Sequence, residues 1–317
     1  MFKFKNIEKF QGHLRKKRYF EGWYYKIISK DLSHSIVLIP GISLNAEDSH
    51  AFIQVFYYTY AKIPTIQTHY VKFDINSFLY HKDNFDISIE NNRFSNNHIH
   101  LDIKNQDISL NGDISINNHT KLNQTLFQPN IMGIFSYFPK MECNHGILSM
   151  NSIANGMLIY QEKTLNFDTA KVYIEKDWGK SFPSQYIWIQ SNHFNHPNTS
   201  IMFSYATIPF LGLKFKGLIA HVTIDSNHYT FATYNFSRIL NKIIKSNEVT
   251  FKIKKRNYTL HIHATSIDSV KLKSPHQGKM IQEIKEGLSG KIDVELIYKK
   301  ETLLKDTGLY AGIEIMF

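Results

Sequence analysis

Two short runs of the sequence place carboxyl groups beside tryptophan and glycine. They are Phe20–Lys26 (FEGWYYK) and Glu175–Pro183 (EKDWGKSFP). A neighbouring indole partly removes an acid from water, and desolvation raises a carboxyl pKa so that the group can stay protonated and donate. Glu21 and Asp177 are therefore candidate proton donors. The residues alone favour the alternative, in which both accept N–H hydrogen bonds and fix the end of a strand.

Two histidine pairs have a spacing that places both rings on one face of a strand: His98 with His100, and His261 with His263. Such a pair could hold zinc together with a carboxylate, but exposed strand histidines are the favoured interpretation, and no metal site is predicted. His145 follows an apolar segment, and a structural histidine is favoured there too. Because Cys143 is the single cysteine, a disulfide within the chain and a four-thiolate site are excluded.

The composition favours a folded β protein with a basic surface. The 317 residues are 43% hydrophobic and 14% aromatic, with a formal net charge of +10. Aromatic enrichment favours strands. The charge is compatible with anionic partners, but a surface with excess lysine is the favoured interpretation because the basic residues are spread along the chain. No nucleic-acid-binding module or phosphate-binding glycine loop occurs, so no nucleic-acid partner is predicted. Without an apolar signal core at Met1–Lys5 or a bilayer-spanning run, we expect a soluble cytoplasmic protein.

The sequence pattern predicts β-strands along most of the chain, and these strands must position the candidate groups. Apolar and polar residues alternate at 85–90, 99–103 and 218–224, and turn residues recur about every 8 to 12 residues. This pattern predicts an all-β fold of antiparallel barrels or sandwiches. The apolar residues of 239–244 share one helical face, which predicts a short helix there.

The two acid-tryptophan runs lead into similar orders of strand and turn, which suggests a duplicated β-domain. The first leads into strands at 24–28 and 36–39, and the second into strands at 186–190 and 201–205. The boundary is expected in the polar stretch 161–168. Between the halves, an apolar segment broken by glycine and proline is expected to be covered or to line a ligand cavity; it spans residues 130–141.

Taken together, these runs resemble the tocopherol cyclase family. The resemblance covers nearly the whole chain, and the segments that carry it are Phe20–Tyr24, Glu175–Pro183, Trp188–Phe194, a C-terminal pattern from Leu260 to Leu296, and Phe138–Gly146, which is similar to the bacterial branch. It implies an all-β fold of two tandem lipocalin-like antiparallel β-barrels. We place these barrels at residues 1–165 and 166–317.

The resemblance also implies a tocopherol cyclase-like isomerase that closes a prenylated quinol into a chromanol ring without a cofactor. That reaction requires an acid to protonate an alkene, aromatic faces near the cation, and exclusion of water. The acid candidates are Glu21, Asp177, Glu175 and His145. The candidate residues for the ligand-site walls are Trp23, Tyr24, Tyr25, Phe138, Trp178, Trp188 and His193.

Two other functions remain open from the sequence. A non-catalytic lipocalin-type protein would bind the same kind of ligand without converting it. A related alkene hydratase would protonate the alkene but admit water to the cation. In each case the expected partner is a hydrophobic small molecule, a prenylated aromatic or other isoprenoid, and peripheral membrane contact is an additional expectation to test.

Overall fold

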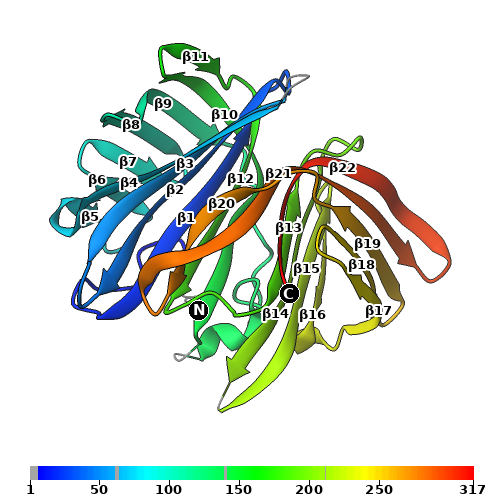
Figure 1. Ribbon diagram of the computed structural model, residues 1–317. Helices are drawn as coiled ribbons and strands as arrows, with labels where there is room; N and C mark the ends of the chain where they lie inside the picture. The colour runs from blue at the N-terminus through cyan, green and yellow to red at the C-terminus, as the bar shows by residue number, and fades with distance from the viewer. Residues whose placement is uncertain (1–5, 61–63, 139–140, 211) are drawn as a thin grey trace. The chain divides into compact units, whose positions relative to one another are not determined.

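The chain folds into two large antiparallel β-sheets, which confirms the predicted all-β class (Figure 1). The computed structural model describes residues 6–60, 64–138, 141–210 and 212–317. Met1–Lys5, where no apolar signal core was expected, lies outside these residues. Pro139 and Lys140 of the apolar segment also lie outside them. Within the described residues, no helix is long and apolar enough to cross a bilayer.

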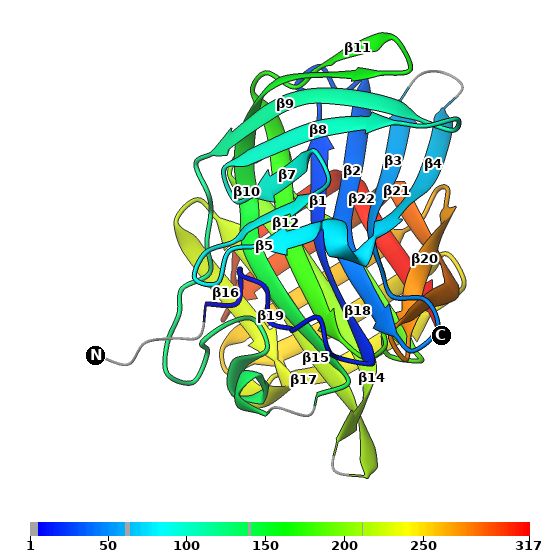
Figure 2. The same cartoon turned by 90° about the vertical axis from the view of Figure 1, so that its left-hand side faces the viewer.

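The first sheet has 12 strands, in the order β4-β3-β2-β1-β12-β10-β9-β8-β7-β6-β5, with β11 paired to β10. Figure 2 shows most of these strands side by side. Their bounds are β1 (Arg18–Ile28), β2 (His34–Asn45), β3 (His50–Thr59), β4 (Thr65–Asp74), β5 (Phe78–Tyr80), β6 (Asp86–Ile89), β7 (Asn92–Ser95), β8 (His98–Lys104), β9 (Ser109–Asn117), β10 (Cys143–Tyr160), β11 (Lys163–Asn166) and β12 (Ala170–Gly179).

The second sheet has 10 strands, in the order β16-β15-β14-β13-β22-β21-β19-β18-β17, with β20 paired to β21. Their bounds are β13 (Tyr186–Ser191), β14 (Thr199–Phe210), β15 (Leu213–Ile224), β16 (Asn227–Ala232), β17 (Arg238–Ile244), β18 (Glu248–Lys255), β19 (Tyr258–Thr265), β20 (Val270–His276), β21 (Lys279–Tyr298) and β22 (Glu301–Met316).

Each sheet opens with four consecutive strands and pairs the first of them with a later long strand. In the first sheet β1 pairs with β12, and in the second β13 pairs with β22. The strands predicted to correspond in the two halves therefore occupy equivalent places, β1 with β13 and β2 with β14. Each strand order is a path with free ends, so the pairing does not establish the two closed barrels that we expected.

The division along the chain differs from a cut at residue 165. One compact unit comprises Met1–Leu122, Cys143–Phe182 and Lys273–Gln282, and the other comprises Asn123–Glu142, Pro183–Leu272 and Glu283–Phe317. Strand β12 lies beyond the predicted boundary but belongs to the first sheet. The tip of the β20–β21 hairpin also belongs to the first unit, where the Ser43 hydroxyl donates to the Gly278 carbonyl at 2.7 Å.

The two acid-tryptophan runs are neighbours in one sheet, where the second run lies on β12 and pairs with the first run on β1. In the β1–β12 ladder, Phe20 lies opposite Gly179, Glu21 opposite Trp178 and Gly22 opposite Asp177. Long-range antiparallel pairing brings the runs together, and local sequence carries little information about such a register.

The predicted helix at 239–244 is also wrong, because this segment is the edge strand β17, paired with β18. β-Branched isoleucines favour a strand, and a bulge between Ile239 and Asn241 interrupts the simple alternation. The described residues contain three short 3-10 helices: η1 (Ile75–Ser77), η2 (Gly133–Tyr137) and η3 (Thr233–Asn235). Helix η2 lies in the apolar segment, where the Tyr234 hydroxyl donates to the Ile131 carbonyl at 3.0 Å.

Candidate functional site

Strand β12 carries polar side chains on both faces, and alternation assigns them to two different clusters. Val172, Ile174 and Trp178 belong to the packed core of the first sheet, so Lys176 points to that inner face. Tyr173, Glu175 and Asp177 point to the opposite, outer face. One strand thus supplies a buried cation to the core and two carboxylates to the other side of the sheet.

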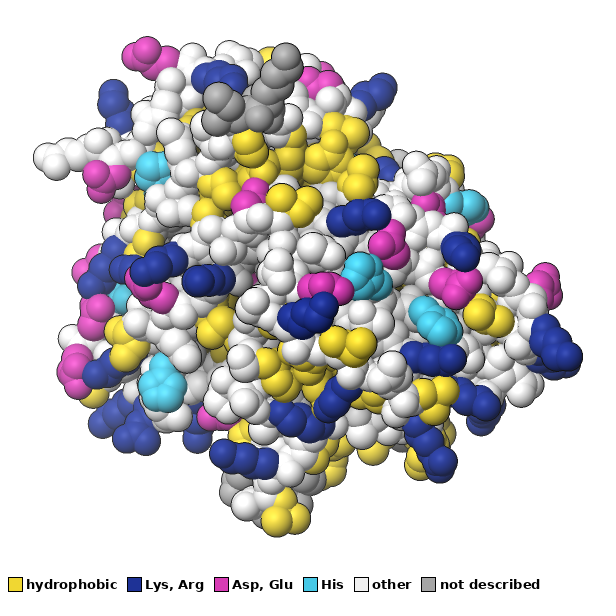
Figure 3. All heavy atoms as spheres, turned by 45° about the vertical axis from the view of Figure 1, so that its right-hand side comes forward, with side chains coloured by type: hydrophobic (Ala, Val, Ile, Leu, Met, Phe, Trp, Pro, Cys, Tyr) yellow, Lys and Arg dark blue, Asp and Glu magenta, His cyan; other side chains and the backbone are white. Residues whose placement is uncertain are grey.

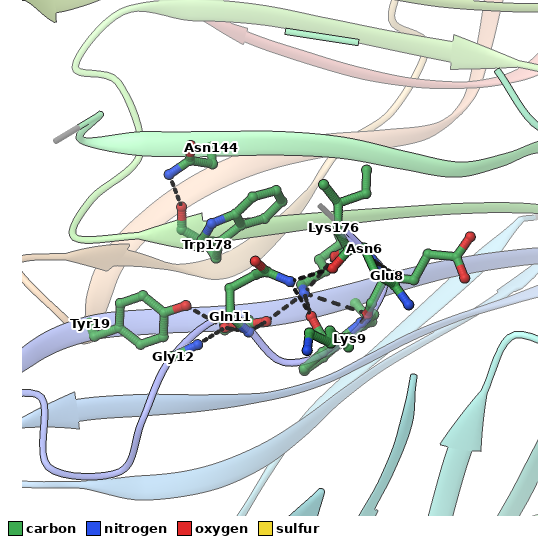
Figure 4. Close-up of polar contacts among 12 residues, drawn as sticks. Asn6, Glu8, Lys9, Gln11, Gly12, Tyr19, Asn144, Lys176 and Trp178 are labelled. Atoms are coloured by element: carbon green, nitrogen blue, oxygen red, sulfur yellow. Dashed lines mark hydrogen bonds and ion pairs between the residues drawn. The ribbon is translucent and has the colours of Figure 1, made fainter. Parts of the chain in front are cut away.

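On the inner face, Lys176 forms a fully buried ion pair with Glu21, with Nζ 2.5 Å from Oε1 and both side chains 0% exposed (Figure 4). The ammonium also donates to the carbonyls of Ile7, at 2.9 Å, and Lys9. It lies 4.6 Å from the ring centroid of Trp23. These contacts satisfy a charge that would otherwise be costly to bury.

Glu21 is held by donors on both of its oxygens. The Gln11 backbone N–H donates to Oε1 at 2.8 Å, the Gly12 N–H donates to Oε2 at 3.1 Å, and the Tyr19 hydroxyl also donates to Oε2. Burial, followed by the adjacent Glu21 charge, raises the pKa of Tyr19 far above its usual value, so Tyr19 remains a donor. These are the contacts of a carboxylate anion that fixes residues 7–12 to the sheet, the structural alternative left open by the sequence.

On the outer face, Glu175, His145 and Asp177 form a second cluster. His145 Nδ1 lies 2.9 Å from Asp177 Oδ1, and His145 Nε2 lies 3.5 Å from Glu175 Oε2. The Tyr173 hydroxyl donates to Glu175 Oε2 at 2.5 Å. The side chains of Glu175, His145 and Asp177 are 6%, 16% and 24% exposed, so the cluster becomes more open to solvent toward Asp177.

The cluster holds a proton on His145 at neutral pH. Burial lowers the pKa of His145, but the charges of Asp177 and Glu175 and the hydrogen bond to Asp177 outweigh it and raise the pKa to about 9. Burial, followed by the Glu175 charge, raises the pKa of Tyr173 well above its usual value. The imidazole is therefore protonated, hydrogen-bonds to Asp177 and forms an ion pair with Glu175, while Tyr173 stays a neutral donor.

The β1 register supplies the neighbours of this outer cluster. Tyr24 lies directly opposite Glu175 and Gly22 directly opposite Asp177. The rings of Tyr24 and Tyr173 meet edge to face, with centroids 6.5 Å apart. Gly22 has no side chain, and an added Cβ there would lie in ordinary contact with Ile39, 3.5 Å away. Glu175 therefore lies among aromatic rings, whereas Asp177 is the most exposed acid of the cluster and lies opposite a residue without a side chain.

A metal ion is the other group that this cluster could bind. Of the described residues, His145, Glu175 and Asp177 are the group whose ligand atoms all lie within 4.8 Å of one another. However, His145 directs different ring nitrogens at the two carboxylates, and one ion cannot take both nitrogens of one ring. The observed ring orientation fits a bridging imidazolium better than a metal ligand.

Three of the four histidines in the two pairs contact carboxylates. His98 and His100 both contact Asp113 Oδ1, at 3.1 and 2.9 Å. His263 lies between Glu248, at 3.1 Å, and Asp293, at 3.4 Å. These carboxylates lie on strands that neighbour β8 and β19.

The other predicted site residues do not share one face. Trp23, Tyr25 and Trp178 lie in the core on the inner face of the first sheet, where Trp23 stacks on Phe85 at 5.1 Å. Only Tyr24 of the predicted aromatic walls lies beside Glu175. The remaining predicted residues belong to the second unit: Trp188 is buried on β13, His193 lies 2.9 Å from Asn192 Oδ1, and Phe138 is exposed.

Two β12 residues of these clusters were missed by the sequence reasoning, namely Tyr173 and Lys176. The signal was present in β12, because Tyr173, Glu175 and Asp177 follow a period of two that leaves Lys176 on the other face. What the sequence lacked was the assignment of the faces, which depends on the packing of the sheet.

Comparison with known proteins shows the family to which this chain belongs. The model of the tocopherol cyclase-like family matches residues 119–316, more than half of the chain. The chain belongs to the tocopherol cyclase-like family. A rice protein (Oryza sativa subsp. japonica) named probable tocopherol cyclase, chloroplastic, is 29% identical over 68 residues, which is 22% of this chain and 14% of the rice protein. The match thus spans a small part of the length of that relative.

Solved structures with the same fold span nearly the whole chain. An AttH-like protein from Nitrosomonas europaea aligns over 99% of this chain and 97% of its own, with a TM-score of 0.54 and 11% identity. Kievitone hydratase from Nectria haematococca aligns over 98% and 92%, with a TM-score of 0.52 and 11% identity. CghA in complex with Sch210972 aligns over 94% and 88%, with a TM-score of 0.61 and 8% identity.

The family match includes the whole outer cluster but not the first acid-tryptophan run. Strands β10 and β12, which carry His145, Glu175 and Asp177, lie within residues 119–316. Glu21 lies outside that range.

The charge on His145 should make stability depend on pH. A folded pKa of about 9, above the usual 6.5, contributes stability that is complete below the lower value and is lost as the pH rises through the upper one. We expect His145→Gln to cost up to about 3 kcal/mol more near pH 6 than near pH 10. Urea denaturation of both proteins at the two pH values measures this, and an equal cost at both would contradict it.

Proposed function

We propose that this protein catalyses the cofactor-independent, acid-catalysed ring closure of a prenylated quinol or a related isoprenoid. The observation that supports the proposal is the largely buried Tyr173–Glu175–His145–Asp177 cluster, which holds a proton beside aromatic rings. Membership of the tocopherol cyclase-like family supports the substrate class.

The proposed proton path begins on His145. Transfer from Nε2 to Glu175, 3.5 Å away, produces a neutral carboxylic acid beside a neutral imidazole. Glu175 then gives the proton to one alkene carbon, so that a C–H bond forms, the π bond breaks and the other carbon becomes a tertiary cation. The phenol oxygen forms a C–O bond to that cation, and its proton returns to the Asp177–His145 pair. The product is an isomer of the substrate.

The cluster also has the charge that such a cation needs. After Glu175 has donated, both carboxylates are ionised and the imidazole is neutral, so negative charge lies next to the developing positive charge. The rings of Tyr24 and Tyr173 add faces that attract a cation. The low exposure of the Glu175 side chain, 6%, keeps water from the donor.

Hydration of the alkene is the second candidate. Asp177 is the most exposed acid of the cluster and lies opposite Gly22, so water could reach this side and be deprotonated by the Asp177–His145 pair. The fold shared with kievitone hydratase is compatible with this reaction. A non-catalytic binding protein would retain the cluster only as a structural ion pair.

Incubation with a prenylated hydroquinone in deuterated water separates these functions. Ring closure is expected to give an isomer of the substrate in which one carbon-bound hydrogen is deuterium from the solvent, detected by mass spectrometry. Hydration would instead add one water molecule. Recovery of unchanged quinol that nevertheless binds the protein would contradict catalysis on this substrate class and support the binding function.

A further inference from the structure

One end of the second unit exposes large apolar side chains that the proposed reaction does not use. We call it the apolar end and define it by Leu126, Phe127, Tyr137, Phe138 and Leu213. Phe127 and Leu213 are 74% and 77% exposed. Figure 3 shows hydrophobic side chains at this lower end with Lys and Arg side chains around them. Exposed apolar groups gathered in this way mark interaction sites.

Ring contacts and hydrogen bonds connect the apolar end. The Tyr137 hydroxyl donates to the Leu126 carbonyl at 2.8 Å, and Phe138 contacts Phe135 with ring centroids 6.3 Å apart. Phe135 stacks on Phe215 of β15 at 5.5 Å, two residues from Leu213. Figures 1 and 2 both place η2, the short green helix, and the β14–β15 hairpin at the lower end of this unit.

The chain segments that form the apolar end carry basic charges. Residues 114–141 and 178–224, which supply all of it, contain no Asp or Glu, and the next acids along the chain are Glu142 and Asp225. They do contain lysines, among them the exposed Lys214 and Lys216 next to Leu213. Lys216 donates to the neutral Gln185 Oε1 at 3.0 Å and lies 4.5 Å from the Phe317 ring centroid.

We propose that the apolar end docks on the surface of an anionic lipid bilayer. Phe127 and Leu213 would enter the boundary between headgroups and acyl chains, Tyr137 would stay at the headgroup level, and the lysines would face lipid phosphates. A protein partner fits less well, because protein interfaces are depleted in lysine. Docking is independent of the proposed reaction, but it would place the protein where an isoprenoid substrate dissolves.

Vesicle flotation of the full-length protein tests the docking. We expect it to float with equimolar phosphatidylcholine and phosphatidylglycerol vesicles, much less with phosphatidylcholine alone, and less at high salt. Phe127→Ser combined with Leu213→Ser should weaken binding at least about tenfold. Lys214→Gln should weaken it about fivefold, on anionic vesicles only. Turnover of detergent-dispersed quinol should not change in the double variant.

The matched control is Leu79→Ser, which removes another exposed leucine (63%) from β5 of the first unit and should leave flotation intact. Circular dichroism and thermal melting check that each variant folds. Failure of the wild type to float, or equal loss in the control, overturns the proposal. A dimer in solution that the double variant abolishes would identify a second copy as the occupant and would also overturn it.

Discussion

Replacing Lys176 by methionine is expected to lower the free energy of unfolding by about 3–5 kcal/mol. The substitution leaves the buried Glu21 carboxylate without its cation and removes the donor that holds the carbonyls of Ile7 and Lys9. Urea denaturation near neutral pH measures the loss. Limited proteolysis should show earlier cleavage in residues 6–12, because the ion pair fixes this segment to the sheet.

The matched control is Lys72→Met on β4, which breaks a lysine–carboxylate pair of similar length with Asp48. Both of those side chains are about half exposed, 52% and 53%, so the loss should be within about 1 kcal/mol. Equal losses for the two variants would show that burial of the Glu21–Lys176 pair has no energetic consequence.

A double-mutant cycle separates the interaction between Glu21 and Lys176 from the other contacts that each side chain makes. Glu21→Gln keeps an oxygen for the Gln11 and Gly12 backbone donors but removes the charge. Combined with Lys176→Met, it should cost less than the sum of the single changes by at least about 1 kcal/mol, because neither charge is then left alone. Additive losses would contradict a direct interaction between the two charges.

The sequence was sufficient for the fold class and for most strands of the sheets. Alternation at 85–90 and 99–103 predicted β6 and β8 because side-chain period is a local property. The prediction failed where tertiary packing decides. Residues 239–244 combine a helix-like spacing with pairing to β18, and pairing prevailed. The acid-tryptophan runs are about half a chain apart, and their register could not be read from either run alone.

The candidate site was predicted in part, for a related reason. Glu175, Asp177 and His145 were all named, and the β10–β12 register brings them together. Glu21 was named with them because it lies in a similar run. A strand places alternate residues on opposite faces, so Glu21 lies with Trp23 and Lys176 on the core side, away from Glu175. Which face of the strand meets the core is decided by the packing of the sheet, and the sequence of one strand does not show it.

Replacing Glu175 by glutamine is expected to lower kcat/KM for ring closure by about 10²- to 10⁴-fold, the usual contribution of a general acid. Glutamine has nearly the same shape and keeps an oxygen that can accept from Tyr173, so the sheet should fold normally. It cannot carry the transferred proton. The measurement is product formation from the prenylated hydroquinone, with circular dichroism to check the fold.

The matched control is Glu47→Gln, which neutralises an exposed carboxylate that pairs with Lys279 at 2.6 Å and should leave turnover unchanged. A second readout distinguishes chemistry from structure. Removing the Glu175 charge takes away one of the groups that raise the pKa of His145, so the imidazole should titrate at lower pH in nuclear magnetic resonance spectra. If Glu175→Gln keeps full turnover while Asp177→Asn loses it, the donor is Asp177, and the proton path must run through this more exposed acid of the cluster.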